Sequence, residues 1–129
     1  MKEYCERWEP SGKLKNYGNF PVIYDIEYFL PDGLAIKMSD MYGKRVSFVF
    51  ANGVWAQRGT EESLRLRPIA LPLEYSVFFK VINSSYIKWL SEKSGDEIDF
   101  SQLTHFVFAG SNLILDVVAG SEPSVEFIN

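Results

Sequence analysis

The residue types that most often carry chemistry at neutral pH are scarce in this sequence. Among 129 residues there is one histidine, His105, and one cysteine, Cys5. Histidine, activated cysteine and paired carboxylates supply most of the acids, bases and nucleophiles of enzymes near pH 7. A catalytic site would therefore have to be built around His105 and a nearby partner.

His105 lies in a predicted β-hairpin. Residues 105–109 and 113–118 have the composition of strands, and a connection over residues 109–112 would set His105 opposite Asp116. A carboxylate in that position fixes the orientation of an imidazole, as in a nucleophilic triad. The sequence has no Gly-x-Ser-x-Gly motif to supply the nucleophile. We therefore predict that His105 and Asp116 form a structural pair; finding both side chains in a deep open cleft beside a Ser or Cys would overturn this interpretation.

The acidic residues do not indicate a metal site. Asp96, Glu97 and Asp99 are the densest group, but they lack the ligand spacing and glycine of an EF-hand calcium loop. A zinc site usually needs several His or Cys ligands, and the chain has one of each. The nine glycines are scattered and form no phosphate-binding loop. We expect no metal ion and no cofactor.

Acidic residues are concentrated in the second half of the chain. Residues 1–67 contain ten basic and nine acidic residues, whereas residues 68–129 contain three and eight. Such a surface repels phosphate backbones and attracts basic partners, so nucleic-acid binding is disfavoured. A solvated face that keeps the chain soluble is the simpler interpretation of the same charges. From residue 92 onward the acidic residues are Glu92, Asp96, Glu97, Asp99, Asp116, Glu122 and Glu126.

Length and composition predict a single domain over residues 1–129. No apolar run approaches the roughly 20 residues of a membrane-spanning helix, and the first residues lack the apolar segment of a secretory signal. One cysteine cannot form an internal disulfide, so we expect a cytoplasmic protein that does not act at membranes. Residues 1–20 are predicted to be an irregular arm that docks through Trp8, Leu14 and Phe20.

Period-two alternation predicts three antiparallel strands over residues 22–30, 34–39 and 45–50. If the turn aligns Leu30 with Leu34, then Glu27 faces Lys37 on the polar face. The residues of the first strand predicted to face the core are Tyr24, Ile26, Tyr28 and Leu30.

The segment after this meander has two interpretations. Asn52-Gly53 is either the turn of a hairpin leading into a fourth strand over 54–58 or a bulge within one long strand. Thr60 suits the N-cap of a short helix that Pro68 would end. Further strands are predicted over 75–82 and 125–128.

A helix is predicted from Ser84 to Ser94, capped by Asn83 or Ser84 and ended by Gly95. Its apolar stripe includes Trp89, which we expect to anchor the helix on a sheet. The sequence therefore predicts an α+β domain of mainly antiparallel strands, as a meander, half-barrel or sandwich, with one packed helix near 84–94.

Aromatic residues are numerous: three Trp, seven Tyr and ten Phe. Tyrosine tolerates an interface because one end of its side chain is polar, and Tyr4, Tyr17 and Tyr42 lie where exposure is expected. An aromatic core is the simpler interpretation of the same surplus.

Some segments carry a likeness to known proteins. Within residues 20–127 they are Arg45–Phe50, Arg58, Glu61-Glu62, Phe78–Trp89, His105–Val107, Asp116-Val117 and Glu122-Pro123. In these the chain resembles a group of small uncharacterised proteins from Gram-positive bacteria. Some of those proteins are encoded beside secreted toxins, so the resemblance implies an immunity role and no catalytic residues.

We therefore expect a non-catalytic protein-binding module, in its most specific form a toxin-neutralising immunity protein. Asp96, Glu97 and Asp99 would steer a basic protein partner, and nearby aromatic residues would anchor it. The alternative is a small-ligand-binding protein or hydrolase-like enzyme whose pocket is lined by Tyr24 and Tyr28. A homo-oligomer is compatible with both.

Overall fold

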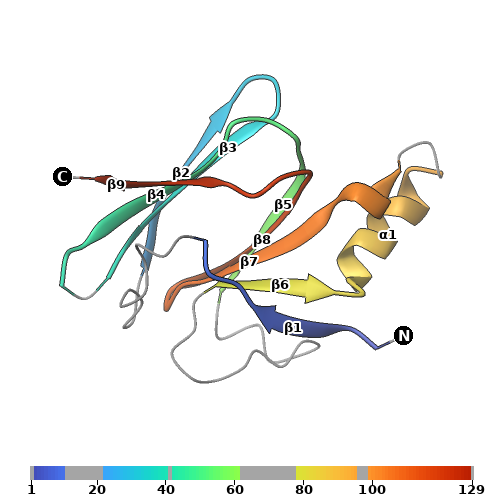
Figure 1. Ribbon diagram of the computed structural model, residues 1–129, viewed down its shortest axis with the longest axis horizontal. Helices are drawn as coiled ribbons and strands as arrows, with labels where there is room; N and C mark the ends of the chain where they lie inside the picture. Colours follow the sequence, from blue (N-terminus) through green and yellow to red (C-terminus); the bar gives the residue numbers. More distant parts are fainter. Residues whose placement is uncertain (1, 11–21, 41, 62–77, 96–98, 129) are drawn as a thin grey trace.

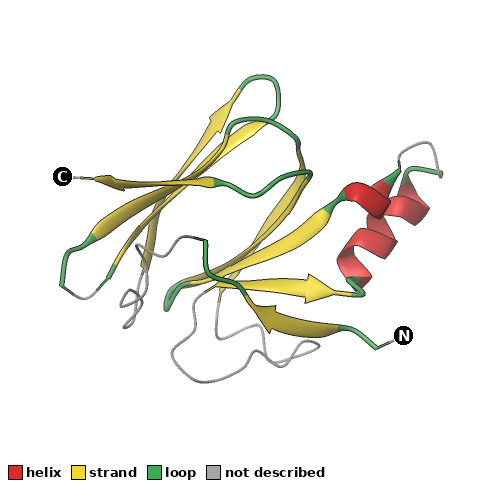
Figure 2. Cartoon of the chain, viewed as in Figure 1, coloured by secondary structure: helices red, strands yellow, loops and turns green. Residues whose placement is uncertain are grey.

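The computed structural model describes residues 2–10, 22–40, 42–61, 78–95 and 99–128 (Figure 1). This part of the chain forms mainly antiparallel strands in two sheets, with one α-helix and one short 3-10 helix (Figure 2). The fold is therefore α+β, as predicted. The elements in chain order are β1 (Tyr4–Arg7), β2 (Val22–Phe29), β3 (Gly33–Ser39), β4 (Arg45–Phe50), β5 (Val54–Glu61), β6 (Phe78–Ile82), α1 (Ser85–Lys93), η3 (Phe100–Gln102), β7 (Thr104–Ala109), β8 (Leu113–Ala119) and β9 (Ser124–Ile128).

The first sheet has the order β2-β3-β4-β9. Its first three strands are the predicted meander, and β9 is the predicted terminal strand, which pairs with β4. Along β4 the apolar residues of the core alternate, at Val46, Phe48 and Phe50, as the period-two pattern implies. The fully buried apolar residues of β3 and β4 are Leu34, Ile36, Met38, Val46, Phe48 and Phe50.

The register of the first hairpin differs from the prediction by two residues. Tyr28 pairs with Leu34, and Lys37 lies opposite Asp25 while its Nζ reaches Glu27 diagonally at 2.7 Å. An irregularity between Ile23 and Asp25 turns Ile23 inward in place of Tyr24, as a β-bulge does. Three of the four residues predicted to face the core are exposed: Tyr24, Tyr28 and Leu30 are 43%, 66% and 98% exposed, the last two toward and beyond the end of β2.

The second sheet has the order β1-β6-β7-β8-β5. The fourth strand predicted over 54–58 is present as β5, but Asn52-Gly53 is neither a hairpin turn nor a bulge in one long strand, because β5 pairs with β8 and not with β4. At Gly53 the chain crosses between the sheets with φ +75°, and the carbonyl of Gly53 accepts a hydrogen bond from the N–H of Gly120. Thr60 lies within β5 and is not a helix cap.

The predicted strand over 75–82 is present from Phe78, and residues 75–77 lie outside the described residues. The N-terminal arm is not irregular throughout, because β1 pairs with β6. Trp8 docks as expected and is 7% exposed, whereas Leu14 and Phe20 lie outside the described residues.

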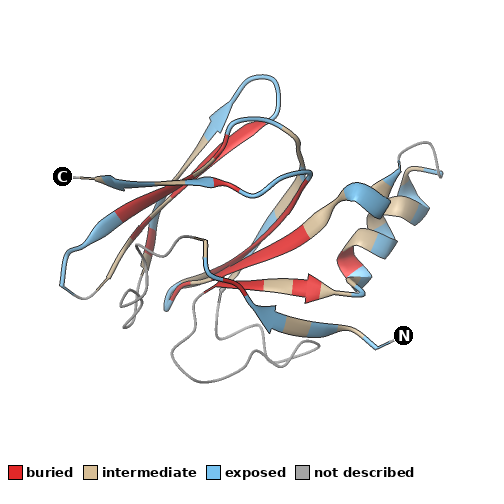
Figure 3. Ribbon diagram, in the orientation of Figure 1, coloured by how far each residue is buried: buried red, intermediate tan, exposed pale blue. Residues whose placement is uncertain are grey.

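The main core lies between the two sheets and draws residues from both. It is strongly aromatic: the ring of Trp8 lies 4.8 Å from that of Phe106, and the ring of Phe48 lies 5.2 Å from that of Phe108. Buried residues accordingly concentrate in the strands of both sheets (Figure 3). Much of the aromatic surplus thus serves the core.

The opposite face of the second sheet is covered in part by α1 (Figure 1). Ser84 caps this helix and Gly95 follows it with φ +68°, as expected. The buried anchor is Tyr86, at 7% exposure, whereas Trp89 is 51% exposed and stacks on Tyr86. The prediction that Trp89 anchors the helix is therefore wrong. The first turn of α1 contacts the sheet through Tyr86, whose ring lies 5.6 Å from that of His105, whereas Trp89 in the next turn stays largely exposed. No described helix combines the length and apolar character needed to cross a membrane.

Candidate functional site

The hairpin of β7 and β8 brings His105 and Asp116 together, by a different register from the predicted one. A hydrogen bond from Gly110 N–H to the carbonyl of Leu113 closes a tighter turn, so His105 lies opposite Val118. The shift is two residues, and a two-residue shift keeps every side chain on its face. His105 and Asp116 are therefore diagonal neighbours on the face beneath α1, with Nε2 and Oδ1 2.6 Å apart.

Two further side chains extend this pair. The hydroxyl of Ser84 lies 2.7 Å from Nδ1 of His105, and Nε of Arg58 donates to Oδ2 of Asp116 at 3.1 Å. We call these four residues the polar chain. It joins the N-terminus of α1 to the β7–β8 hairpin and to β5.

The proton positions in the polar chain follow from the chemistry of its members. A carboxylate only accepts hydrogen bonds, so Nε2 of His105 is the donor to Asp116. In the neutral ring Nδ1 then carries a lone pair, which accepts the hydroxyl proton of Ser84. Both His105 and Asp116 are fully buried, at 0% exposure, so this arrangement is shielded from water.

The sequence signal for Ser84 was its suitability as a helix cap, and its contact with His105 was missed. Asn83 and Ser84 form a tight connection between β6 and α1, with Asn83 at φ +57°, a conformation that asparagine tolerates better than most residues. The side chain of Asn83 is held by a hydrogen bond to the carbonyl of Lys2. A serine on a constrained strand-to-helix turn was therefore present without the glycine motif that usually marks one.

The hydroxyl of Ser84 has a second role as the N-cap of α1. Its Oγ accepts the N–H of Ile87 at 3.1 Å. The next backbone N–H, that of Ser85, donates to the carboxylate of Glu3 at 2.6 Å. An anion at this end of a helix is favourable, so Glu3 helps to fasten β1 to α1.

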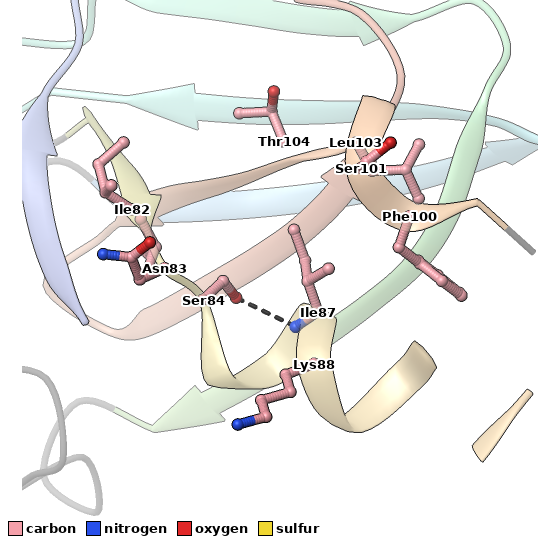
Figure 4. A pocket seen from close by; sticks show the side chains of 10 residues that line it. Ile82, Asn83, Ser84, Ile87, Lys88, Phe100, Ser101, Leu103 and Thr104 are labelled. Carbon is pink, nitrogen blue, oxygen red and sulfur yellow. Dashed lines mark hydrogen bonds between the residues drawn. The ribbon is translucent and has the colours of Figure 1, made fainter. Parts of the chain in front are cut away.

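A cavity of about 580 Å³ opens beside Ser84, between the start of α1 and η3 (Figure 4). Its walls combine apolar and polar side chains, with Lys88 as a cationic residue. The lining residues are Val81, Ile82, Asn83, Ser84, Ile87, Lys88, Phe100, Ser101, Leu103 and Thr104.

A second hollow of about 430 Å³ lies on the other side of α1. It is lined by Arg58, Ser85, Tyr86 and Trp89. Burial raises the pKa of Tyr86, with the nearby positive charge of Arg58 acting against this effect. Neither of these two cavities is lined by Tyr24 or Tyr28, the residues expected in the small-ligand alternative.

Two of the described acidic residues of the second half are engaged in contacts within the fold. Asp116 is buried in the polar chain, and Glu122 accepts from Nε1 of Trp8 at 2.6 Å and lies 3.3 Å from Nζ of Lys80. Two of the predicted steering residues, Asp96 and Glu97, lie outside the described residues.

The third steering residue, Asp99, is exposed and is the N-cap of η3. Its carboxylate accepts hydrogen bonds from the hydroxyl and N–H of Ser101, and these contacts hold the pKa of Asp99 below its usual value. Asp99 therefore carries its charge beside Phe100, the first residue of that 3-10 helix.

Exposed apolar side chains lie on both of the elements that the contact between Val54 and Asp32 joins. The ring of Trp55 contacts that of Phe100, with centroids 6.3 Å apart. Trp55 is 53% exposed, and the turn after β2 carries Leu30 at 98% exposure. We call this surface the aromatic ridge, made of Tyr28, Leu30, Trp55 and Phe100.

Two hydrogen bonds hold the ridge together across the sheets. Nε2 of Gln57 donates to the hydroxyl of Tyr28 at 2.9 Å, and the N–H of Val54 donates to the carbonyl of Asp32 at 3.1 Å. They connect the end of the β2–β3 hairpin to β5, so the ridge lies on two tied elements. Its position could not be read from the sequence, because Trp55 lies in β5 of one sheet and Leu30 in the turn that follows β2 of the other.

Comparison of the chain with protein-family models, with curated proteins and with solved structures gave no match.

Proposed function

We propose that the protein is a protein-binding module that holds a basic partner on the aromatic ridge. The exposure of Tyr28, Leu30 and Trp55 carries this proposal. Large apolar side chains gathered on one surface favour a protein contact, and aromatic residues are frequent anchors of interfaces.

The charges beside the ridge support a basic partner. Asp32 and Asp99 are both exposed, and each lies next to a ridge element, the β2–β3 turn or η3. Carboxylates at the border of an apolar patch accelerate association with a basic surface and keep other acidic proteins away. This replaces the wider acidic surface expected from the sequence, which the burial of Asp116 divides.

The shape of the ridge depends on how the sheets meet. We infer that they face one another as a sandwich and do not close into a half-barrel. The support is that each described sheet has its own two edge strands, while one core cluster draws on both.

The most specific form of the proposal is an immunity protein that neutralises a toxin in the cytoplasm. A nuclease toxin is basic because it binds a phosphate backbone, so an acidic, aromatic surface suits its active site. The chain's resemblance to proteins encoded beside toxins supports the same assignment.

The experiment is affinity capture from the native cell with three baits. They are the wild-type chain, a ridge variant with Leu30→Ser and Trp55→Ala, and a control with Tyr42→Ala. Tyr42 is 79% exposed and lies in the turn between β3 and β4, at the other end of that sheet from Leu30. We expect a basic protein that wild type and control retain and that binds the ridge variant at least about 30-fold more weakly.

Charge neutralisation then tests the steering residues. Asp32→Asn with Asp99→Asn keeps both side-chain shapes and should slow association at low salt, whereas Glu126→Gln on β9 should not. Equal capture by the ridge variant would reject the ridge as the binding surface. If no protein is captured and a small-molecule library raises the melting temperature, the small-ligand alternative replaces this proposal.

A further inference from the structure

We infer that Ser84 is a nucleophile activated by His105, and that it attacks esters of short apolar acids held in the cavity beside it. This inference does not depend on the proposed binding function. It replaces the expectation that the chain carries no catalytic residue. Ser84 lies beside His105 in the structure, although the sequence has no Gly-x-Ser-x-Gly motif.

The geometry meets the requirements of an activated serine. The nucleophile and base are 2.7 Å apart, and the base is oriented by a carboxylate 2.6 Å from its other nitrogen. Asp116 is in turn paired with Arg58 at 3.1 Å, which favours its ionised form. The ring presents Nδ1 to the serine, whereas the chymotrypsin arrangement presents Nε2, and either nitrogen can accept the proton.

The exposure of Ser84 to a cavity favours a nucleophilic role over a purely structural one. His105 and Asp116 are fully buried, but Ser84 is half-buried and lines the cavity of about 580 Å³. A serine needed only as a helix cap and strand link gains nothing from facing a cavity. In Figure 4 the Ser84 side chain lies between Asn83 and Ile87 on the wall of this cavity.

The cavity lining indicates the substrate class. Ile87, Phe100 and Leu103 offer an apolar surface for an acyl chain, and Lys88 is a cation that can face a developing oxyanion. The size suits a short acyl group better than a folded protein substrate. We therefore assign the site to esters of small apolar acids.

The reaction follows from these positions. Oγ of Ser84 attacks the ester carbon while its proton moves to Nδ1 of His105, and the proton then passes to the leaving alkoxide as the carbon–oxygen bond breaks. The product alcohol departs and the acyl group stays on Ser84. A water molecule attacks the acyl carbon, gives its proton to Nδ1, and the acid leaves as Ser84 regains that proton.

The test uses an alkyl fluorophosphonate, which reacts with an activated serine by forming an oxygen–phosphorus bond and releasing fluoride. We expect mass spectrometry of the labelled full-length protein to locate one adduct, on Ser84. Ser84→Ala should abolish it, and His105→Gln should slow it at least about 100-fold, the contribution of a general base. Ser85→Ala is the matched control, because Ser85 is bonded to Glu3 and should not change the rate.

A second measurement separates loss of reactivity from loss of the fold. Ser84→Thr keeps a hydroxyl cap for α1, so a folded Ser84→Thr variant with slow labelling supports a positioned nucleophile. Hydrolysis of p-nitrophenyl butyrate should follow the same order of variants. Wild-type protein that stays unlabelled at millimolar probe while its circular dichroism is native would overturn the inference, as would labelling that His105→Gln does not slow.

Discussion

The guanidinium of Arg58 lies over the ring of Tyr86, with its central carbon 4.1 Å from the ring centroid, while its Nε donates to the buried carboxylate of Asp116. One side chain thus contacts both the helix that covers the second sheet and the charge beneath it. Arginine suits this position because its planar group stacks on an aromatic ring and forms directed hydrogen bonds at its edge. The stability of α1 on the sheet should therefore depend on Arg58.

Replacing Arg58 with Met should lower the free energy of unfolding by about 1–3 kcal/mol, the cost of leaving a buried acceptor without one partner. Methionine keeps an unbranched apolar stem, so the change mainly removes the hydrogen bond, the charge and the stacking. Urea unfolding followed by circular dichroism measures the effect. Lys2→Met, at an exposed position before β1, is the control and should cost much less. Equal midpoints for the two variants would contradict a stabilising role of the Arg58 contacts.

Tyr86 predicts a stability change at alkaline pH. Burial raises the pKa of this phenol above that of an unfolded tyrosine, which is about 10. The unfolded chain therefore loses this proton first, and the contribution of Tyr86 is complete below pH 10 and decreases as the pH rises toward the folded pKa. Tyr86→Phe has no proton to lose at this position, so its urea midpoint should fall less between pH 9 and about 11.

The control for this titration is Tyr42→Phe, at an exposed turn position. It should follow the wild-type pH dependence. A Tyr86→Phe curve parallel to wild type over the same range would show that another group causes the alkaline loss.

The sequence predicted the positions of most strands, but it did not predict which residues of neighbouring strands lie opposite each other. Both predicted hairpins have registers two residues from the observed ones, in β2–β3 and in β7–β8. A period-two pattern cannot detect such a shift, because it leaves every side chain on the same face. His105 and Asp116 are therefore in contact although the predicted register is wrong, as diagonal neighbours and not as a directly opposite pair. At Tyr24 the bulge changed the face itself, and nothing in the local alternation indicated it.

The remaining errors concern contacts between segments far apart in the chain. After Gly53 the chain enters β5, which pairs with β8, more than 50 residues later in the sequence. The local turn signal at Asn52-Gly53 predicted pairing with β4 instead. Ser84 meets His105 only because α1 folds back over the second sheet. Local propensity predicts the helix and its cap, but it does not specify which face of a sheet the helix covers.

Gly33 is the first residue of β3, and Gly43 lies in the turn between β3 and β4. A Cβ on Gly33 would lie 2.9 Å from the carbonyl oxygen of Ala51 and 3.1 Å from that of Phe50, closer than the backbone can allow without moving. Gly43 has open space around it but a φ of +80°, which costs an L-residue about 1–2 kcal/mol. Gly33→Ala should therefore destabilise by overpacking and Gly43→Ala by backbone strain.

The two variants are distinguished by what else they change. Gly33→Ala must displace the crossover after β4, which is next to the turn that carries Leu30, so it should weaken partner capture by the aromatic ridge as well as lower the urea midpoint. Gly43→Ala should lower the midpoint alone. Gly43→Asn should recover part of that loss, because asparagine tolerates positive φ. Full stability of Gly33→Ala, with unchanged capture, would mean that the close approach of β3 to the crossover does not fix the ridge.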